Sequence, residues 1–247
     1  DGLEKDPRAK QIENAQLADY RKDLREELRI YEEATYARLA ALLKGQTTLS
    51  GGGLAKGTKL TDAVLPAVAL KPLCSGERDD VAILAEASGG VLTMDEINPI
   101  WLRTPAAPLV GAALEQRAIS LDDLETWFNG VAATRQSILV EGAGGWLVPV
   151  TGTETLADVA CRFALPVIPI VANKLGCINH ALLTIESIRA RGLECPGLIL
   201  NSATEPDDVA KQTNRDVLSQ FTNVLVEIGC GQTEISASEL RRIFPLA

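Results

Sequence analysis

The sequence has few of the residues that mark common catalytic and metal sites. Its 247 residues include one histidine and five cysteines, and aromatic residues make up 4%. The single histidine, His180, accompanies no Ser or Cys in a recognisable nucleophile setting, so we interpret it as structural rather than as a catalytic base. The cysteines are odd in number and never lie at the two-residue spacing of zinc or redox motifs. They therefore indicate reduced thiols, as in a cytosolic protein.

Long apolar runs and an excess of positive charge are also missing. No stretch approaches the ~18 uninterrupted apolar residues of a membrane span. The opening segment, DGLEKDPRAK, lacks the apolar centre of a signal peptide. Lys and Arg number 24 against 33 Asp and Glu, a formal net charge of -9, and a surface of that sign repels a nucleic-acid backbone. The sequence therefore predicts a soluble, cytoplasmic protein without a nucleic-acid or membrane partner.

Residues 9–44 follow a helical pattern. Apolar residues, among them Leu17, Leu24, Leu28 and Leu39, recur every three or four positions, and neither Gly nor Pro interrupts them. This pattern predicts one long amphipathic helix. A helix of this length needs a surface for its apolar stripe: the domain that follows, a second copy of the chain, or a different protein.

Behind this helix, a Gly- and Ser/Thr-rich stretch predicts a linker, and short apolar strands then alternate with helices. That alternation is typical of an α/β fold with a mostly parallel sheet covered by helices on both faces. The predicted strands are residues 64–72, 137–142, 166–173, 196–201 and 223–229. The predicted helices are residues 79–88, 121–134, 155–163, 178–191 and 207–221. The predicted domains are a helical segment at 1–45, a linker at 46–62 and an α/β domain at 63–247.

Ligands of such sheets bind at the carboxyl ends of the strands, so the residues there are the candidates for chemistry. The first predicted strand ends at Lys71, and Ser75 and Asp80 follow it closely. The second ends at Glu141 and continues into a glycine-rich turn that contains Gly144. A cation, carboxylates and exposed backbone N–H groups suit an anion or metal site. Lys71 taken alone also fits a surface lysine whose stem lies on apolar residues.

Two asparagines at later strand ends allow two interpretations each. Asn179 lies near the start of a predicted helix, where it fits an N-cap or a binding role. Asn201 ends a predicted strand, and its amide offers both a donor and an acceptor, as recognition of a purine edge requires. An asparagine in a turn explains the same position.

Four segments resemble the dethiobiotin synthetase family in their order and separation. They are LKPLCSG (70–76), DEINPIWLRTPAAP (95–108), VEGAGGWLVPV (140–150) and KLGCINHALLT (174–184). The resemblance extends over residues 66–234, about two thirds of the chain. It implies a P-loop NTPase-like fold and a homodimer that carboxylates 7,8-diaminopelargonic acid with CO2. Such an enzyme of biotin biosynthesis then phosphorylates the carbamate with MgATP, and the product closes to the cyclic urea of dethiobiotin.

The resemblance also implies roles for the residues around the first two strand ends. Lys71 would stabilise charge on the carbamate and the phosphate, with Ser75 assisting. Asp80 and Glu141 would hold Mg2+. These roles make physical sense, because phosphoryl transfer depends on charge neutralisation and positioning more than on a covalent nucleophile.

Three further residues would contact ligands directly if the resemblance holds. Gly144 would offer backbone contacts to the substrate, and Asn201 would recognise the adenine of ATP. Asn179 would bind the substrate carboxylate from the opposite subunit. The predicted cofactors are accordingly ATP and Mg2+, and the predicted small-molecule partner is the diamine.

One feature of the family is not found in this sequence. Its members open with a strand and a phosphate-binding loop that ends in Gly-Lys-Thr. The nearest segment here, residues 52–59, keeps the glycine spacing but reverses the last Gly-Lys pair. No apolar strand precedes it, and the distance from Lys59 to Lys71 is too short for a crossover helix. We therefore predict that the P-loop is missing. The chain is then either an unconventional enzyme or a noncatalytic homologue that binds partners through its N-terminal helix.

Overall fold

The computed structural model describes residues 68–135, 137–202, 208–229, 239 and 242–243. The predicted N-terminal helix, the predicted linker and the candidate phosphate loop at residues 52–59 lie outside these ranges. The division into segments 1–45, 46–62 and 63–247 therefore stays a prediction. Within the described ranges, no helix is long and apolar enough to cross a membrane.

Strands and helices alternate through the described chain, and every pairing between its named strands is parallel. The strands are β1 (Val68–Leu70), β2 (Leu73–Ser75), β3 (Ile100–Leu102), β4 (Ile138–Val140), β5 (Ile170–Ala172), β6 (Leu198–Asn201) and β7 (Val224–Ile228). The helices are α2 (Asp79–Ala87), α3 (Met94–Ile97), α4 (Pro108–Leu114), α5 (Leu121–Ala132), α6 (Leu156–Phe163), α7 (Cys177–Ala190) and α8 (Val209–Leu218). Parallel strands joined by helices confirm the predicted P-loop NTPase-like α/β class.

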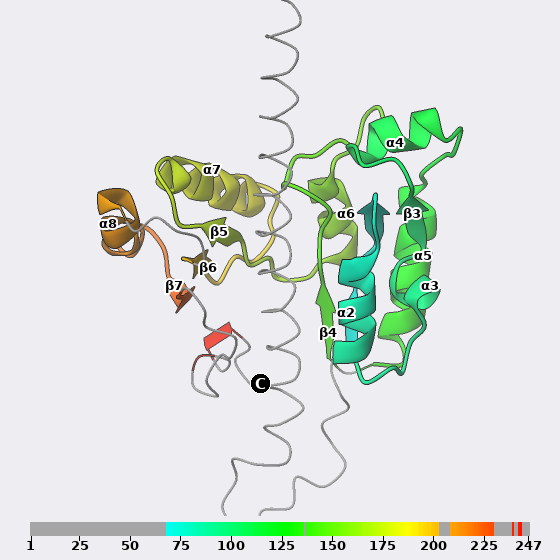
Figure 1. The fold of residues 1–247 in the computed structure, drawn as a ribbon, viewed down its shortest axis with the longest axis horizontal. Helices are drawn as coiled ribbons and strands as arrows, with labels where there is room; N and C mark the ends of the chain where they lie inside the picture. Colours follow the sequence, from blue (N-terminus) through cyan, green and yellow to red (C-terminus); the bar gives the residue numbers. More distant parts are fainter. Residues whose placement is uncertain (1–67, 136, 203–207, 230–238, 240–241, 244–247) are drawn as a thin grey trace, which may run out of the picture.

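The strands form three small sheets. β1 pairs with β4, β2 pairs with β3, and β5, β6 and β7 form a three-stranded sheet in that order. Figure 1 shows the elements as two groups, with β5 to β7, α7 and α8 on the left and β1 to β4 with α2 to α6 on the right. Since parallel strands need covered faces, each group carries its own layer of helices.

In the group that holds β1 and β4, α5 and α6 cover the strands. Their apolar residues pack with Leu70 of β1 in one buried cluster. The rings of Phe128 on α5 and Phe163 on α6 stack with centroids 4.2 Å apart. α2 is fixed to β1 by Ser88, whose hydroxyl accepts from the Ala69 N–H at 2.9 Å and donates to the Leu84 carbonyl. These bonds hold the C-terminal end of α2 against β1, and an ion pair between Lys71 and Asp80 holds the start of α2 beside the carboxyl end of β1.

In the group that holds β5 to β7, α7 supplies the covering face. Ala181, Ile185 and Ile188 recur at helical spacing on α7 and pack with Leu198 and Leu200 of β6 in one buried cluster. Another buried cluster contains residues of β1 and α2 together with residues of β6 and β7. Its members include Ala69, Leu84, Ile199 and Val226. This cluster links the two groups through a common apolar core.

The structure corrects three local predictions. β2 and β3 were not predicted as strands, because neither lies in a longer apolar run: Pro72 precedes β2, and Pro99 and Arg103 flank β3. α3 and α4 were not predicted either, although Pro108 stands at the first position of α4, where a proline fits a helix. The N-cap interpretation of Asn179 is wrong, because α7 begins at Cys177 and its N-cap is Gly176, with φ +90°. A left-handed backbone favours glycine at that position.

Candidate functional site

A buried group of charges lies at the carboxyl ends of β1 and β4. The Lys71 ammonium donates to Glu141 Oε1 at 2.9 Å and also forms an ion pair with Asp80. Side-chain exposures are 5% for Lys71, 7% for Asp80 and 17% for Glu141. The structure thus brings together three of the predicted site residues, which we call the Lys71 cluster. Two carboxylates around one ammonium leave this cluster with more negative than positive groups.

The backbone of Lys71 is held by the segment that precedes β3. Asn98 is 2% exposed, and its side-chain amide donates to the Lys71 carbonyl at 2.8 Å and to the Ile100 carbonyl at 3.0 Å. The Lys71 N–H donates to the Ile97 carbonyl at 3.0 Å. Sequence reasoning missed Asn98, whose only signal was its place before a proline within the motif DEINPIWLRTPAAP. The contacts of Asn98 therefore fix the backbone position from which the Lys71 side chain extends.

Cys74 on β2 borders the Lys71 cluster, and Ser75 is the next residue of the same strand. The Cys74 Sγ lies 3.7 Å from an Asp80 oxygen, and burial together with that carboxylate raises the pKa of the thiol to about 12. Cys74 is therefore a neutral thiol at physiological pH. The Ser75 Oγ is buried and has no hydrogen-bond partner within the part of the chain that the structure describes. A buried hydroxyl of this kind suits a contact with a polar ligand.

The turn after β4 follows Glu141 directly. Gly144 is exposed and has φ +75°, a left-handed conformation that favours glycine. The Trp146 Nε1 donates to Ser187 Oγ of α7 at 3.1 Å, and the Leu109 N–H donates to the Pro149 carbonyl at 3.2 Å. The turn is thus held from α7 and from α4 while the backbone of Gly144 faces solvent. A glycine-rich turn of this kind suits the approach of an anion to backbone N–H groups.

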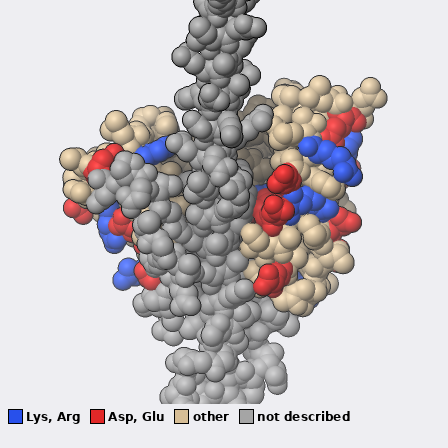
Figure 2. All heavy atoms as spheres, in the orientation of Figure 1, with Lys and Arg blue, Asp and Glu red and all other residues tan. Residues whose placement is uncertain are grey.

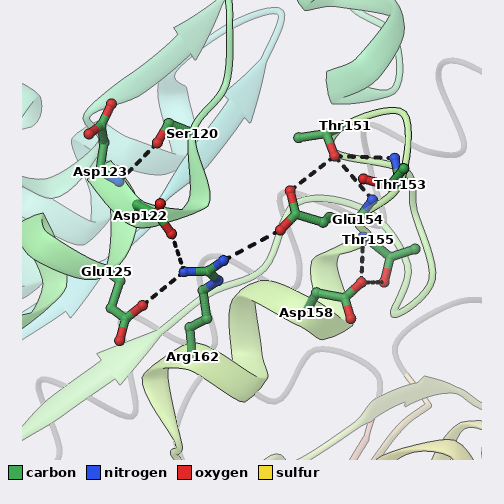
Figure 3. A network of polar contacts seen from close by, with 10 residues as sticks. All are labelled: Ser120, Asp122, Asp123, Glu125, Thr151, Thr153, Glu154, Thr155, Asp158 and Arg162. Carbon is green, nitrogen blue, oxygen red and sulfur yellow. Dashed lines mark hydrogen bonds and ion pairs between the residues drawn. The ribbon is translucent and has the colours of Figure 1, made fainter.

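Arg162 connects α6 with two other parts of the same group (Figure 3). Its guanidinium forms ion pairs with Asp122 and Glu125 of α5 and with Glu154, at 2.5, 3.0 and 3.5 Å. Hydrogen bonds to Asp122 and Glu125 raise the pKa of Arg162 above its ordinary value. The Glu154 backbone carbonyl in turn accepts from the Val150 N–H at 2.9 Å. Arg162 therefore holds the end of the segment between Glu141 and α6 against α5.

Thr155, beside Arg162 in Figure 3, begins α6 with a capping box. The Thr155 N–H and hydroxyl both donate to Asp158 at 2.7 Å, and these bonds hold the pKa of Asp158 below its usual range. On the face drawn in Figure 2, positive and negative side chains stand next to one another on both groups of elements. Charges on this face are therefore compensated over short distances.

The two predicted asparagines lie on other elements than the Lys71 cluster. Asn201 ends β6 and is 2% exposed, whereas Asn179 lies in the first turn of α7 and is exposed. Asn173, directly after β5, is a buried residue that sequence reasoning did not single out. The Asn173 backbone N–H donates to the Asn201 carbonyl at 2.8 Å, so Asn173 and Asn201 lie at the same edge of the sheet. The sequence did offer a signal for Asn173, because an asparagine at the end of a predicted strand was also what pointed to Asn201.

The Lys71 cluster fits a magnesium ion bound together with phosphate. Mg2+ takes oxygen ligands and is commonly held by one or two protein carboxylates plus substrate phosphates. Asp80 and Glu141 supply two such carboxylates, largely buried and converging on one ammonium. No group of three or more metal-ligating side chains occurs in the described ranges. The donor set thus suits a cation shared with a ligand better than one caged by the protein alone.

Parallel strands flanked by helices, with a lysine and two carboxylates at the strand ends, define an α/β protein of the P-loop NTPase-like class. A family profile described as an AAA domain matches residues 45–230. The chain is also 39% identical over 175 residues to the ATP-dependent dethiobiotin synthetase BioD of Akkermansia muciniphila, covering 70% of this chain and 82% of that protein. The chain belongs to the dethiobiotin synthetase family.

Other relatives give the same result. The BioD protein of Anaeromyxobacter dehalogenans is 39% identical over 165 residues, or 65% of this chain and 74% of the relative. That of Cellvibrio japonicus is 37% identical over 169 residues, or 68% of this chain and 69% of the relative. The profile match includes residues 52–59, which lie outside the described ranges. The predicted loss of the P-loop therefore stays a prediction.

Proposed function

We propose that this chain is an ATP- and Mg2+-dependent dethiobiotin synthetase of biotin biosynthesis. Its reaction is the carboxylation of 7,8-diaminopelargonic acid, followed by phosphorylation and closure of the cyclic urea. The observation that carries the proposal is the Lys71 cluster, in which an ammonium and two carboxylates meet at adjacent strand ends. The relatives are named ATP-dependent dethiobiotin synthetases, which supports the same assignment.

In this proposal Lys71 neutralises the oxygens that carry charge during carbamate formation and phosphoryl transfer. Its ammonium is fixed by two carboxylates and by the backbone contacts of Asn98, so little reorganisation is needed when a ligand arrives. The Ser75 hydroxyl, buried and without a partner among the described residues, adds a hydrogen bond to the same ligand. Positioned charge of this kind is what phosphoryl transfer requires.

Asp80 and Glu141 would hold Mg2+, which neutralises phosphate charge when it is bound. The backbone at Gly144 would contact the substrate, and Asn201 would recognise adenine. Asn179 is exposed on α7, which suits a contact with a substrate held by a second copy of the chain. A homodimer is therefore part of the proposal.

The test is formation of dethiobiotin from the diamine, bicarbonate and MgATP by the full chain. Glu141→Gln keeps the size of the side chain and removes one carboxylate from the Lys71 cluster. We expect Mg2+-dependent turnover to fall by about 100-fold or more, as when a preorganised electrostatic group is removed from an active site. The matched control is Glu186→Gln on the exposed face of α7, which should keep its rate. An unchanged rate for Glu141→Gln would remove Glu141 from the metal site.

The second candidate is a noncatalytic homologue that binds partners through its N-terminal segment. The reversed Gly-Lys pair in residues 52–59 favours it, because the family loop uses that lysine on the phosphates. Calorimetric titrations with MgATP and with 7,8-diaminopelargonic acid separate the two functions. Micromolar binding of MgATP contradicts the noncatalytic function. Retained diamine binding without MgATP binding supports it.

A further inference from the structure

We infer that a hydrogen-bond network centred on the buried Asn173 is a positioning device that couples two loops of the chain. One loop carries Asn201, the proposed nucleotide contact, and the other leads to Asn179, the proposed contact with a substrate held by a second copy of the chain. The network consists of Asn173, Ser202, Asn214, Arg215 and Glu227, and we call it the Asn173 network. None of these residues belongs to the Lys71 cluster or to the predicted ligand contacts. The ligand part of this inference rests on the proposed function, whereas its structural part does not.

The centre of the network is the side-chain amide of Asn173, which uses both its donor and its acceptor. Its Nδ2 donates to Ser202 Oγ at 2.8 Å and to the Lys211 carbonyl at 2.9 Å. Its Oδ1 accepts from Asn214 Nδ2 at 2.9 Å. A residue between β5 and α7 is thereby bonded to the end of β6 and to α8.

Asn214 extends the network toward the loop that leads to α7. Its Nδ2 also donates to the Lys174 carbonyl at 3.2 Å. Lys174 begins the short loop before α7, and Asn179 lies in the first turn of that helix. Asn214 on α8 therefore holds the loop that sets the direction of α7 at its start, and with it the backbone of Asn179.

Ser202 extends the network in the other direction. Its hydroxyl donates to Glu227 Oε1 of β7 at 2.8 Å, and the other carboxylate oxygen of Glu227 lies 3.0 Å from Arg215 Nη1. Ser202 follows Asn201 directly in the chain. The Asn173 N–H bonds the Asn201 carbonyl at 2.8 Å, and the Ser202 N–H bonds the Ile228 carbonyl at the same distance. The backbone on both sides of the Asn201 side chain is thus fixed.

Burial makes this arrangement specific. Asn173, Ser202 and Asn214 are 2%, 6% and 4% exposed. A buried amide that loses its hydrogen-bond partner is still desolvated, and that free-energy cost is no longer offset. The network therefore favours the arrangement in which all of its hydrogen bonds are formed. The Asn173 side-chain amide bonds both Ser202, next to Asn201, and Asn214, which holds the loop before α7. If either of these partners is displaced and Asn173 moves with it, the hydrogen bond to the other partner is lost. The loops that carry Asn179 and Asn201 therefore share one set of constraints.

The structural test is hydrogen exchange of the full chain carrying Asn214→Ala. We expect backbone amides in the loop after Lys174 and at Ser202 to exchange about tenfold faster or more, since two hydrogen bonds of the Asn214 side chain are lost. The matched control is Asp216→Ala, an exposed position one half-turn further along α8, which should leave both segments unchanged. Ser202→Ala is the milder second variant. It should loosen the Asn201 end more than the Lys174 end.

The ligand test compares Michaelis constants in the dethiobiotin assay. We expect Asn214→Ala to raise KM for MgATP and KM for the diamine together, each by about tenfold, or about 1.4 kcal/mol, with a smaller change in kcat. Asn201→Ala, which removes only the proposed adenine contact, should raise KM for MgATP alone. A purely structural role of Asn214 would lower the melting temperature and leave both KM values as they are.

The outcomes separate this inference from the proposed function. A wild-type chain that binds neither MgATP nor the diamine overturns the proposed function, and hydrogen exchange still decides whether the two loops are coupled. Exchange that rises at one loop only, or at neither, in folded Asn214→Ala overturns the coupling. Faster exchange at both loops with unchanged KM values overturns its role in ligand binding.

Discussion

The two groups of elements stabilise their strand ends by different means. Where β1 and β4 end, a lysine and two carboxylates are buried together. Where β5 and β6 end, three amides and a hydroxyl are buried, those of Asn173, Asn201, Asn214 and Ser202. The charged residues there, Glu227 and Arg215, lie nearer the surface, with side-chain exposures of 25% and 46%. One strand-end site is thus ionic and the other largely neutral, although both belong to one parallel α/β fold.

Under the proposed function, this difference separates two chemical tasks. Buried charges interact strongly with phosphate and metal ions, and they hold their positions only while each has its partner. Neutral amides offer donors and acceptors at fixed angles, which suits the edge of a base and the fixing of loops. The charged end is therefore suited to the reacting groups and the neutral end to recognition and alignment. Substitutions at each end should differ in size accordingly.

The largest expected effect is that of Lys71→Met. The substitution leaves Asp80 and Glu141 buried without their cation, so the free energy of unfolding should fall by about 3–5 kcal/mol. Urea denaturation at neutral pH measures the change. The matched control is Lys174→Met at the other strand end, where the side chain is exposed and the change should stay within about 0.5 kcal/mol. A loss at Lys71 no larger than at Lys174 would remove the contrast.

A smaller loss is expected at the neutral end. Asn173→Leu keeps the approximate size of the side chain and removes its hydrogen bonds to Ser202 and Asn214. The free energy of unfolding should fall by about 1–3 kcal/mol, because the remaining groups stay buried without partners. Asn129→Leu on the exposed face of α5 is the control in the same denaturation experiment. A loss larger than that of Lys71→Met would reverse the ranking of the two ends.

At the surface, charge should matter less still. Arg162→Gln removes ion pairs to Asp122, Glu125 and Glu154. The Arg162 side chain is 33% exposed, and those of Asp122 and Glu125 are 84% and 39% exposed. Exposed pairs contribute about 0–1 kcal/mol, so thermal unfolding should shift by only a few degrees. Arg189→Gln, exposed on α7, is the control. A loss as large as that of Lys71→Met would mean that burial is not what sets the difference.

The smallest expected effect is slow alkylation of the Cys74 thiol, which lies beside the Lys71 cluster. Burial and Asp80 raise the pKa of Cys74 to about 12, so the thiolate is rare at pH 8 and alkylation should be slow. Cys161, which is only partly buried, serves as the internal comparison in a mass-spectrometric assay with iodoacetamide. Because the folded pKa is raised, the contribution of Cys74 to stability is constant below pH 9.0 and declines as the pH rises toward 12. Equal alkylation rates would contradict this assignment.

Much of the fold could be predicted from apolar runs. The structure places a strand within each of the five predicted strand segments, since continuous apolar residues such as those of β1 and β4 suit strands covered on both faces. β2 and β3 were missed because a proline or a charged residue stands beside each of them and no longer apolar run surrounds them. The helix predicted at 178–191 corresponds to α7, but the N-cap interpretation of Asn179 was wrong, because Gly176 holds that position with a left-handed backbone.

The site could be predicted in part for the same reason. Lys71 and Glu141 end neighbouring strands, so topology alone brings them to one edge of the sheet. Asn98 and Asn173 act through contacts to residues distant in sequence, such as the Lys71 carbonyl and Ser202. No local pattern reveals such partners, because they exist only once the chain has folded.

The contacts of Asn98 have a consequence for how the chain tolerates changes in length. The stretch from Gly89 to Leu92 connects α2 to the cap of α3, and glycines at 89 and 90 have open space around them. Extra residues there would bulge into solvent. A single residue inserted between Ile97 and Ile100 would instead carry the amide of Asn98 away from the carbonyl it anchors, and the register of β3 against β2 would shift with it. Homologues that differ in length should therefore carry their insertions before α3 rather than after it.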